Sequence, residues 1–280
     1  MTYRLTKHHG LGNDFLVLLG PAAELAGVGP DHALRWCDRR RGIGADGLLL
    51  GTLDGRDGHD LEMVLYNSDG SRPEMSGNGI RCLAQAEADR RGTASVELKV
   101  TTDDGLRTVA VSPGPDSATV VAAVDMGPAL DGPRPDRQRG PTEGAGLTAA
   151  QLAAEPLRQR TLDLGNPHLV LLVEDPGAVV VTAAGPAWEA SFSAGMNVHA
   201  VAPTPGQADA VTMAIWERGA GATQACGTGA TAAARAAHDW GLVGPTVTVH
   251  MPGGDVQVEV GERMTLRGPA VRIATVEVEA

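Results

Sequence analysis

Two stretches of the chain share one pattern, and this repetition constrains the fold more than any other feature. The first stretch runs from Asn67 to Arg81 and the second from Glu217 to Gly229. Each begins with a polar residue after an apolar run, passes through a glycine-containing loop, and reaches Gly-x-Gly before an alanine-containing segment. The repetition predicts a duplicated, mostly β fold with one long helix after each Gly-x-Gly.

The spacing inside the two stretches also matches. Nine residue steps lead from Asn67 to Ser76, and nine lead from Glu217 to Cys226. Ser76 and Cys226 therefore each stand where a helix is expected to begin. The free N–H groups and the dipole of a helix N-terminus bind an anion such as a carboxylate. They also lower the pKa of a thiol placed there. We expect the two ends to face each other around one carboxylate, with a lowered pKa for Cys226.

Composition and charge exclude several classes of protein. A chain of 280 residues with 42% hydrophobic residues suits one large domain or two of ordinary size. The formal charge of −11, without a cluster of basic residues, argues against a nucleic-acid partner. No apolar run approaches the length of a membrane span, and Met1–Gly10 is polar, unlike a signal peptide. We expect a cytoplasmic protein without a membrane partner, and the sequence leaves open whether it forms a homodimer.

The cysteines, histidines and lysines argue against bound cofactors. Cys37, Cys82 and Cys226 are widely spaced and form neither a disulfide framework nor a zinc pattern. The eight histidines show no metal-ligand spacing. Lys7 and Lys99 are the only lysines, and neither lies near a phosphate-binding loop, whereas pyridoxal phosphate requires a Schiff-base lysine. We expect neither a metal ion nor an organic cofactor.

The periodicity of apolar residues places the remaining elements. Strands are predicted at residues 3–7, 15–19, 48–50, 61–66, 96–101, 106–111, 118–124, 169–173, 197–201, 210–216, 246–250, 255–260, 264–266 and 271–278. Helices are predicted at residues 31–40, 77–90, 183–190 and 227–240. Leu34 and Cys37 share a face of the first helix, and Ile80, Leu83 and Ala84 form the apolar side of the second. Residues 126–147, rich in Pro, Gly and Arg, are expected to link two halves.

Seven short motifs occur in an order and spacing that resemble one known family. They are Gly10–Phe15, Gly42–Gly47, Asn67–Ser71, Gly77–Cys82, Gly165–His168, Glu217–Gly219 and Ala225–Gly229. With them, almost the whole chain resembles the diaminopimelate epimerases. The resemblance implies an α/β (α+β) fold of two pseudo-symmetric halves, each a curved mixed β-sheet around a central helix, with the active site in the cleft between them. It places residues 1–125 in the first half, with residues 270–280 returning to it, and residues 126–269 in the second.

The resemblance also implies an activity, with one departure at its centre. The family are isomerases that interconvert L,L- and meso-2,6-diaminopimelate without a cofactor, for lysine and peptidoglycan precursor biosynthesis. One cysteine thiolate removes the α-proton and the thiol of a second cysteine protonates the opposite face. Cys226 matches one of these cysteines, but Ser76 stands in place of the other. Ala222 is a second departure, because the family usually has Glu there.

The resemblance carries further site residues onto this chain. The expected catalytic residues are Cys226, Ser76, His168 and Glu217. The expected substrate-contacting residues are Asn13, Asn67, Gly77, Asn78, Asn166, Asn197, Glu217, Arg218, Gly227 and Thr228.

The chemistry of the side chains suggests what each group does. We expect Arg218 to bind a carboxylate and Glu217 to bind an ammonium group of a small amino-acid substrate. The asparagines at 67, 166 and 197 together suit a second amino-acid head group.

Simpler roles remain for several of these positions. Serine is a preferred N-cap, so Ser76 would serve equally well as the cap of its helix. Asp46 and Asp69 are expected to be turn residues, and Cys37 and Cys82 to be core residues.

Ser76 leaves three alternatives open. One is a divergent amino-acid racemase or isomerase, or a β-eliminating lyase, that uses Cys226 as its main base. Another is a catalytically inactive homologue that retains the ligand-binding pocket. The third is that Ser76 was introduced in place of a natural cysteine. A serine hydroxyl is far less acidic than a thiol, so Ser76 is expected to be a poor base in any of these readings.

Overall fold

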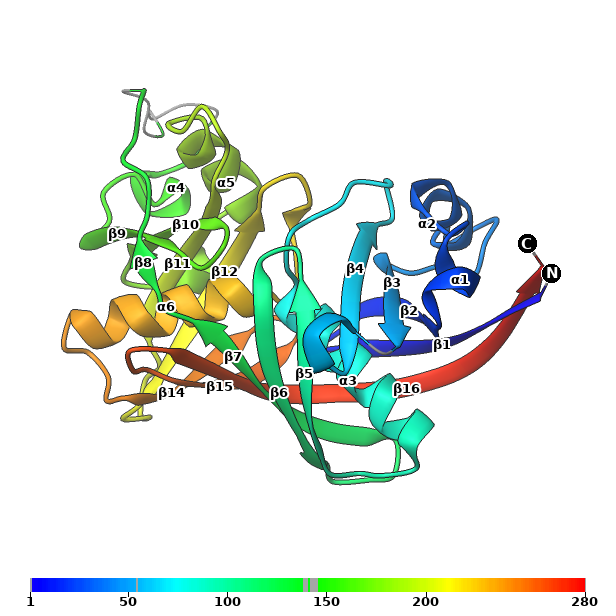
Figure 1. Ribbon diagram of the computed structural model, residues 1–280. Coiled ribbons are helices and arrows are strands. Elements are labelled where there is room, and N and C mark those ends of the chain that lie inside the picture. The colour runs from blue at the N-terminus through cyan, green and yellow to red at the C-terminus, as the bar shows by residue number, and fades with distance from the viewer. Residues whose placement is uncertain (1, 54, 138–140, 142–145, 280) are drawn as a thin grey trace. The chain divides into compact units, whose positions relative to one another are not determined.

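A computed structural model describes residues 2–53, 55–137, 141 and 146–279 (Figure 1). The chain forms two compact units, one of residues 1–125 and 267–280 and the other of residues 126–266. No described helix is long and apolar enough to cross a membrane.

Unit 1 is a mixed sheet with one long helix. Its strands are β1 (Thr2–Gly10), β2 (Asn13–Gly20), β3 (Gly47–Leu53), β4 (Leu61–Asn67), β5 (Val96–Thr102), β6 (Gly105–Pro113), β7 (Thr119–Gly127) and most of β16 (Met264–Glu279). Its helices are α1 (Ala22–Leu25), α2 (Pro30–Trp36), α3 (Gly77–Arg91) and the 3-10 turn η1 (Arg56–Gly58). Strands β1 to β7 are neighbours in chain order, and β16 lies antiparallel to β1, as the red and blue strands of Figure 1 show.

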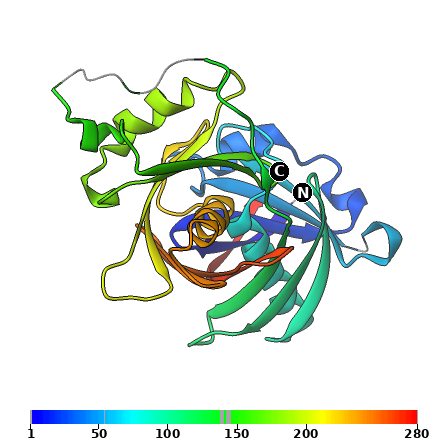
Figure 2. The ribbon, with the colours of Figure 1, turned by 90° about the vertical axis from the view of Figure 1, so that its left-hand side faces the viewer.

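Unit 2 has the same kind of construction. Its strands are β8 (Leu130–Asp131), β9 (Arg158–Asp163), β10 (Pro167–Leu172), β11 (Asn197–Pro203), β12 (Ala210–Glu217), β13 (Gly221–Ala222), β14 (Thr246–Met251) and β15 (Gly254–Glu259). Its helices are α4 (Ala149–Leu152), α5 (Val181–Glu189), α6 (Gly227–Asp239) and the 3-10 turn η2 (Pro176–Ala178). Figure 2 shows α6 almost end-on, with strands of its own unit curving around it.

The strand pairing confirms the duplicated fold. From β1 to β6 successive pairs are antiparallel, parallel, antiparallel, parallel and antiparallel. The series β9, β10, β11, β12, β14 and β15 repeats that order. Within the parallel pairs, Phe15 lies opposite Gly47 and His168 lies opposite Asn197. These two pairs therefore occupy equivalent places, and other equivalent positions follow by counting along the strands.

The two long helices are buried on nearly every side. The predicted apolar side of α3, Ile80, Leu83 and Ala84, is in the core. However, Arg81 and Glu87 on the same helix are buried as well. A helix buried all round lies inside a sheet rather than on its surface, which agrees with a central helix.

One predicted helix is wrong at its C-terminal end. The helix expected at residues 31–40 stops at Trp36, because the N–H groups of Ile43 and Gly44 donate to the carbonyl oxygen of Trp36 at 2.8 and 2.9 Å. Leu34 consequently does not share the buried face with Cys37, since Leu34 is 49% exposed and Cys37 is buried.

Several other predictions differ from the structure in detail. The strands expected at 264–266 and 271–278 are one continuous strand, β16, despite Pro269 within it. Strand β9, rich in Arg and Gln, was not predicted, nor were α1 and α4. The expected link at residues 126–147 contains the short strand β8, and its residues 138–140 and 142–145 lie outside the described part of the chain.

Candidate active site

The two long helices begin with the same local structure. Ser76 is the N-cap of α3, and its Oγ accepts a hydrogen bond from the N–H of Gly79 at 3.0 Å. Cys226 is the N-cap of α6, and its Sγ accepts from the N–H of Gly229 at 3.3 Å. The N-cap interpretation of Ser76 is therefore confirmed, and the same role belongs to Cys226.

The expectation of a lowered pKa for Cys226 is wrong in this structure. Burial raises the pKa of the thiol well above its ordinary value, and the Glu217 carboxylate raises it further. Hydrogen bonds with Thr228 and with the N–H of Gly229 act in the opposite direction and do not compensate. Cys226 is only 3% exposed, and this loss of hydration outweighs the field of the helix N-terminus.

A chain of polar side chains leads from Cys226 into the core of unit 2. Cys226 Sγ lies 3.6 Å from Thr228 Oγ1, and Asn166 Nδ2 lies 3.4 Å from the same hydroxyl. Asn166 Oδ1 lies 2.8 Å from His168 Nε2, and His168 Nδ1 lies 2.9 Å from His199 Nε2. The structure thus brings together four side chains that the sequence predicted for the site, along with one that it did not.

The two histidines of this hydrogen-bonded series, His168 and His199, are neutral. Burial lowers the pKa of His168 well below its ordinary value, and the neighbouring His199 lowers it further. Burial alone lowers the pKa of His199 to about 3. His199 was missed because a histidine in an apolar run is not informative on its own. Its position two residues after Asn197, on the same face of β11, is the signal that could have found it.

Glu217, Arg218 and Asn197 meet at the end of β12. Thr223 Oγ1 donates to Glu217 Oε1 at 2.5 Å. Asn197 is 4% exposed, and its amide binds backbone at both ends. Its Oδ1 accepts from the N–H of Arg218 at 3.0 Å and its Nδ2 donates to the Pro167 carbonyl at 2.8 Å. Asn197 therefore holds the backbone of Arg218, whose side chain is exposed.

In unit 1, the predicted residues Asn13 and Asn78 are joined directly. Asn78 Nδ2 donates to Asn13 Oδ1 at 3.2 Å, and Asn78 Oδ1 accepts from Arg81 Nη2 at 2.8 Å. The guanidinium of Arg81 also donates to the carbonyls of Gly77 and Pro269. Burial lowers the pKa of Arg81 to about 10, so Arg81 stays positively charged at neutral pH.

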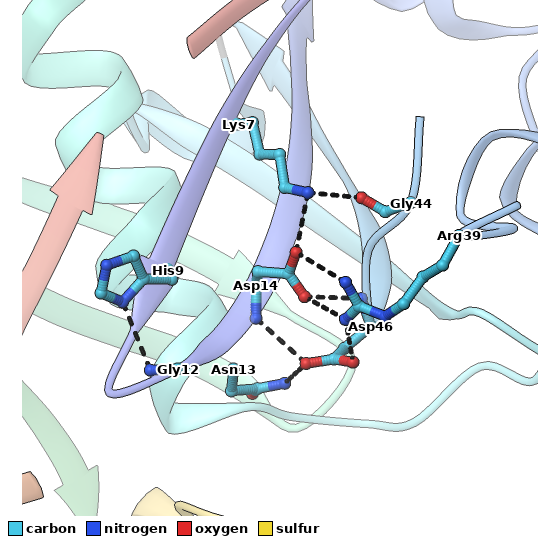
Figure 3. Close-up of polar contacts among 8 residues, drawn as sticks. All are labelled: Lys7, His9, Gly12, Asn13, Asp14, Arg39, Gly44 and Asp46. Atoms are coloured by element: carbon cyan, nitrogen blue, oxygen red, sulfur yellow. Dashed lines mark hydrogen bonds and ion pairs between the residues drawn. The ribbon is translucent and has the colours of Figure 1, made fainter. Parts of the chain in front are cut away.

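Asp46 does more than form a turn, which corrects the prediction (Figure 3). Its Oδ2 accepts from Asn13 Nδ2 at 2.9 Å, and its Oδ1 binds Arg39 at 2.7 Å. Arg39 and Lys7 both bind Asp14, at 2.5 and 2.9 Å. Burial raises the pKa of Asp14, but these cations outweigh it and hold that pKa below its ordinary value. The network fixes the amide of Asn13 in one orientation.

Asp69, Cys37 and Cys82 behave as the sequence indicated. Asp69 accepts from the N–H of Ser71 in a turn, and Asn67 Nδ2 donates to Ser71 Oγ at 2.9 Å. Cys37 and Cys82 are core residues, and burial raises the pKa of each thiol to about 12.

Two further observations concern position 222 and metal binding. Ala222, at the position where the resemblance expects Glu, is exposed on β13. Among the described residues, no group of three or more His, Cys, Asp or Glu side chains could hold a metal ion.

Comparison with known proteins decides the family. Residues 5–130 and 160–273 match the family model of diaminopimelate epimerase. The chain belongs to the diaminopimelate epimerase family. A diaminopimelate epimerase of Synechococcus elongatus is 37% identical over 98% of this chain and 97% of its own length. The chain is accordingly an isomerase, an amino-acid epimerase that acts without pyridoxal phosphate.

Solved structures of lower identity show the same fold. A hydroxyproline epimerase from Agrobacterium vitis covers 99% of this chain and 92% of its own, with a TM-score of 0.70 at 16% identity. A phenazine biosynthesis protein of the PhzF family from Bacillus anthracis covers 100% of both chains, with a TM-score of 0.71 at 14% identity.

Proposed function

We propose that this chain interconverts L,L- and meso-2,6-diaminopimelate by moving the α-proton between two side chains, Cys226 and Ser76. The observation that carries the proposal is that both residues are the N-caps of equivalent helices in a duplicated fold. The relatives at 37% identity, which are named for this activity, support the choice of substrate. The reaction would serve lysine and peptidoglycan precursor biosynthesis.

The helix N-termini supply the electrostatic part of the proposed chemistry. Removing an α-proton places negative charge on the α-carbon and its carboxylate, so the carboxylate needs preorganised donors. The first turns of α3, at Gly77 and Asn78, and of α6, at Gly227 and Thr228, direct backbone N–H groups toward the helix start, where the helix dipole also favours an anion. We propose that these groups bind the reacting carboxylate.

The raised pKa of Cys226 gives Glu217 a role in this proposal. In the absence of substrate the negative charge of Glu217 favours the neutral thiol. An ammonium group bound to Glu217 would offset that charge and lower the pKa of the thiol. Substrate binding itself would then produce the thiolate that acts as the base. His168 stays neutral and supports the site as a hydrogen-bonding group.

The distal head group of diaminopimelate is the remaining specificity element. We propose that Arg218, whose side chain is exposed, binds its carboxylate. Asn67 and Asn166 would complete that subsite. Asn197 would contribute by holding the backbone of Arg218.

Ser76 is the observation that favours a second candidate, a related isomerase or β-eliminating lyase that uses Cys226 alone as its base. An inactive binding protein and an introduced serine are the other two explanations of Ser76. Measurements of α-proton exchange separate the epimerase from the lyase and from the inactive binding protein.

The test is incubation with L,L- or meso-diaminopimelate in D₂O, followed by mass spectrometry and chiral separation. We expect deuterium to enter one stereoisomer faster than epimerisation occurs, because Cys226 exchanges one face while Ser76 is a weak base. Ser76→Cys should then raise epimerisation by about 10²-fold or more, since a thiol is far more acidic than a hydroxyl.

The same assay can contradict the proposal. If Ser76→Cys binds diaminopimelate without exchange or epimerisation, the substrate or the reaction is a different one. Release of a β-substituent from another amino acid by the unchanged protein would favour the lyase.

A further inference from the structure

The buried histidine pair of unit 2 is absent from the equivalent place in unit 1. Counting along the paired strands from Phe15 opposite Gly47 and His168 opposite Asn197 makes Phe15 equivalent to His168 and Leu49 equivalent to His199. Phe15 and Leu49 are buried apolar side chains. The duplicated fold therefore accommodates apolar residues at both positions, and two buried imidazoles are not a requirement of its packing.

His199 stands directly against the start of α6. A Cβ atom at Gly229 would lie 2.6 Å from the His199 ring and 3.0 Å from Cys226 Sγ. At the equivalent Gly79, a Cβ would lie 3.4 Å from Leu49 and 3.3 Å from Ser76 Oγ. The ring thus reaches the first turn of α6, where the N–H of Gly229 donates to Cys226 Sγ, and only a glycine at position 229 leaves room for the ring.

The hydrogen bonds between His199 and Cys226 form a series whose donor and acceptor directions follow from its buried end, His199. His199 Nε2 and His168 Nδ1 lie 2.9 Å apart, and because both imidazoles are neutral, one of these nitrogens carries a hydrogen and the other accepts it. If His199 Nε2 donates, its Nδ1 is a bare acceptor; if His199 Nε2 accepts, its Nδ1 carries a hydrogen. Nδ1 of His199 has no hydrogen-bond partner within the described part of the chain. A buried N–H without an acceptor is rarer and less favourable than an acceptor without a donor, so His199 Nε2 donates.

The remaining directions follow one after another. His168 Nδ1 accepts, so its Nε2–H donates to Asn166 Oδ1 at 2.8 Å. The amide of Asn166 therefore directs Nδ2 toward Thr228 Oγ1, 3.4 Å away. With Oγ1 accepting from Asn166, the hydroxyl hydrogen of Thr228 is free to donate to Cys226 Sγ, 3.6 Å away. A hydrogen bond donated to sulfur favours the thiolate.

We propose that His199 is a positioning residue that sets the direction of this relay, through His168, Asn166 and Thr228, so that a hydroxyl hydrogen is directed at Cys226. The inference rests on the proposed role of Cys226 as the acid/base group. It concerns His199, which is separated from the proposed substrate-contacting residue Asn166 by His168.

Other charged groups near the relay act separately from it. Glu217 faces Cys226 and favours the neutral thiol, and Arg218 lies close enough to His168 to disfavour a charged imidazole. Neither group changes in variants of His199. The comparison of such variants therefore isolates the relay.

The test measures the reactivity of the Cys226 thiol and uses no substrate, so it stays informative even if epimerisation is never observed. Iodoacetamide alkylation would be followed by peptide mass spectrometry across pH 7 to 10. Cys37 and Cys82, whose pKa values are raised to about 12, serve as internal controls. His199→Leu copies the residue at the equivalent place in unit 1, and His199→Gln retains a side-chain N–H donor.

We expect His199→Leu to slow alkylation of Cys226 about tenfold or more and to shift its pH profile upward. His199→Gln should stay within about threefold of the unchanged protein, since it can still donate to His168 Nδ1. Equal rates in all three proteins would overturn the proposal. Equal slowing in both variants would overturn it too, because that result indicates packing rather than donation.

A second measurement needs no variant. Nitrogen-15 NMR of the histidine rings should show both His168 and His199 as the Nε2–H tautomer. A His199 ring carrying its hydrogen on Nδ1 would reverse every direction in the relay and overturn the proposal, even if His199→Leu did not fold.

Discussion

The two helix N-termini have nearly the same backbone and very different surroundings. Ser76 has φ and ψ of −139° and 118°, and Cys226 has −132° and 111°. Five residues further on, Arg81 Nη1 and Thr231 Oγ1 each donate to the carbonyl of the first helical glycine, at 3.0 and 2.9 Å. One copy thus carries a buried cation where the other carries a neutral hydroxyl.

At two equivalent positions in the strands next to these helices, the buried side chains are polar in unit 2 and apolar in unit 1. Unit 1 has Phe15 and Leu49 where unit 2 has His168 and His199. The duplication therefore preserved the position of the N-cap, its glycines and its sheet, while the buried side chains around it diverged. A position in the fold decides where an acid/base group stands, and its buried neighbours decide which proton state that group prefers.

The largest expected effect comes from making both ends hydroxyls. Cys226→Ser removes the thiol at the start of α6, so both epimerisation and α-proton exchange should fall by about 10³-fold or more, equivalent to about 4 kcal/mol. Exchange in D₂O measures this loss. The matched control is Cys82→Ser, which removes a core thiol. If Cys226→Ser kept its exchange while Cys82→Ser lost it, the acid/base role would belong elsewhere.

The next effect concerns stability in acid. His8 in unit 1 is buried, its Nδ1 lies 2.9 Å from Gln85 Oε1, and burial lowers its pKa to about 4. Because the folded state resists protonation of His8, neutral His8 contributes to the unfolding free energy. This contribution is complete above pH 6.5 and is lost as the pH falls toward 4. The strand registers place Leu162 at the equivalent position of unit 2. His8→Leu should therefore reduce the loss of unfolding free energy between these pH values by roughly 3 kcal/mol.

Denaturant unfolding at pH 7 and pH 4 measures that difference. Taking the change with pH within each protein removes any pH-independent effect of the substitution on packing. His168 and His199 remain in both proteins and contribute in the same direction. An identical loss in His8→Leu and the unchanged protein would show that His8 is not buried as a neutral ring.

The smallest effect tests the cap itself. Ser76→Ala removes the oxygen that accepts from Gly79 and should lower the unfolding free energy by about 1 kcal/mol. Ser76→Cys should cost less, because Cys226 shows that a sulfur can accept the same bond at 3.3 Å. Unfolding at neutral pH in denaturant measures both. A larger loss for cysteine than for alanine would break the equivalence of the two caps.

The sequence alone was sufficient to predict the duplicated fold of this protein. The repeated spacing, the Gly-x-Gly pairs and the apolar runs predicted both central helices, the strands that precede them and the N-cap at Ser76. These features are local, since a cap and its first turn involve residues within a few positions of each other. The motifs around Asn13, Asn166 and Glu217 likewise carried the resemblance to the family, which the comparisons with known proteins show.

Only the tertiary structure decided the chemical state of that site. Burial reversed the pKa shift expected for Cys226, because desolvation depends on everything packed around the thiol. Asp46 became a support for Asn13, and His199 joined the chain leading to Cys226, through contacts between separate strands and loops. Such contacts depend on strand register, which the whole sheet determines and no short stretch of sequence encodes.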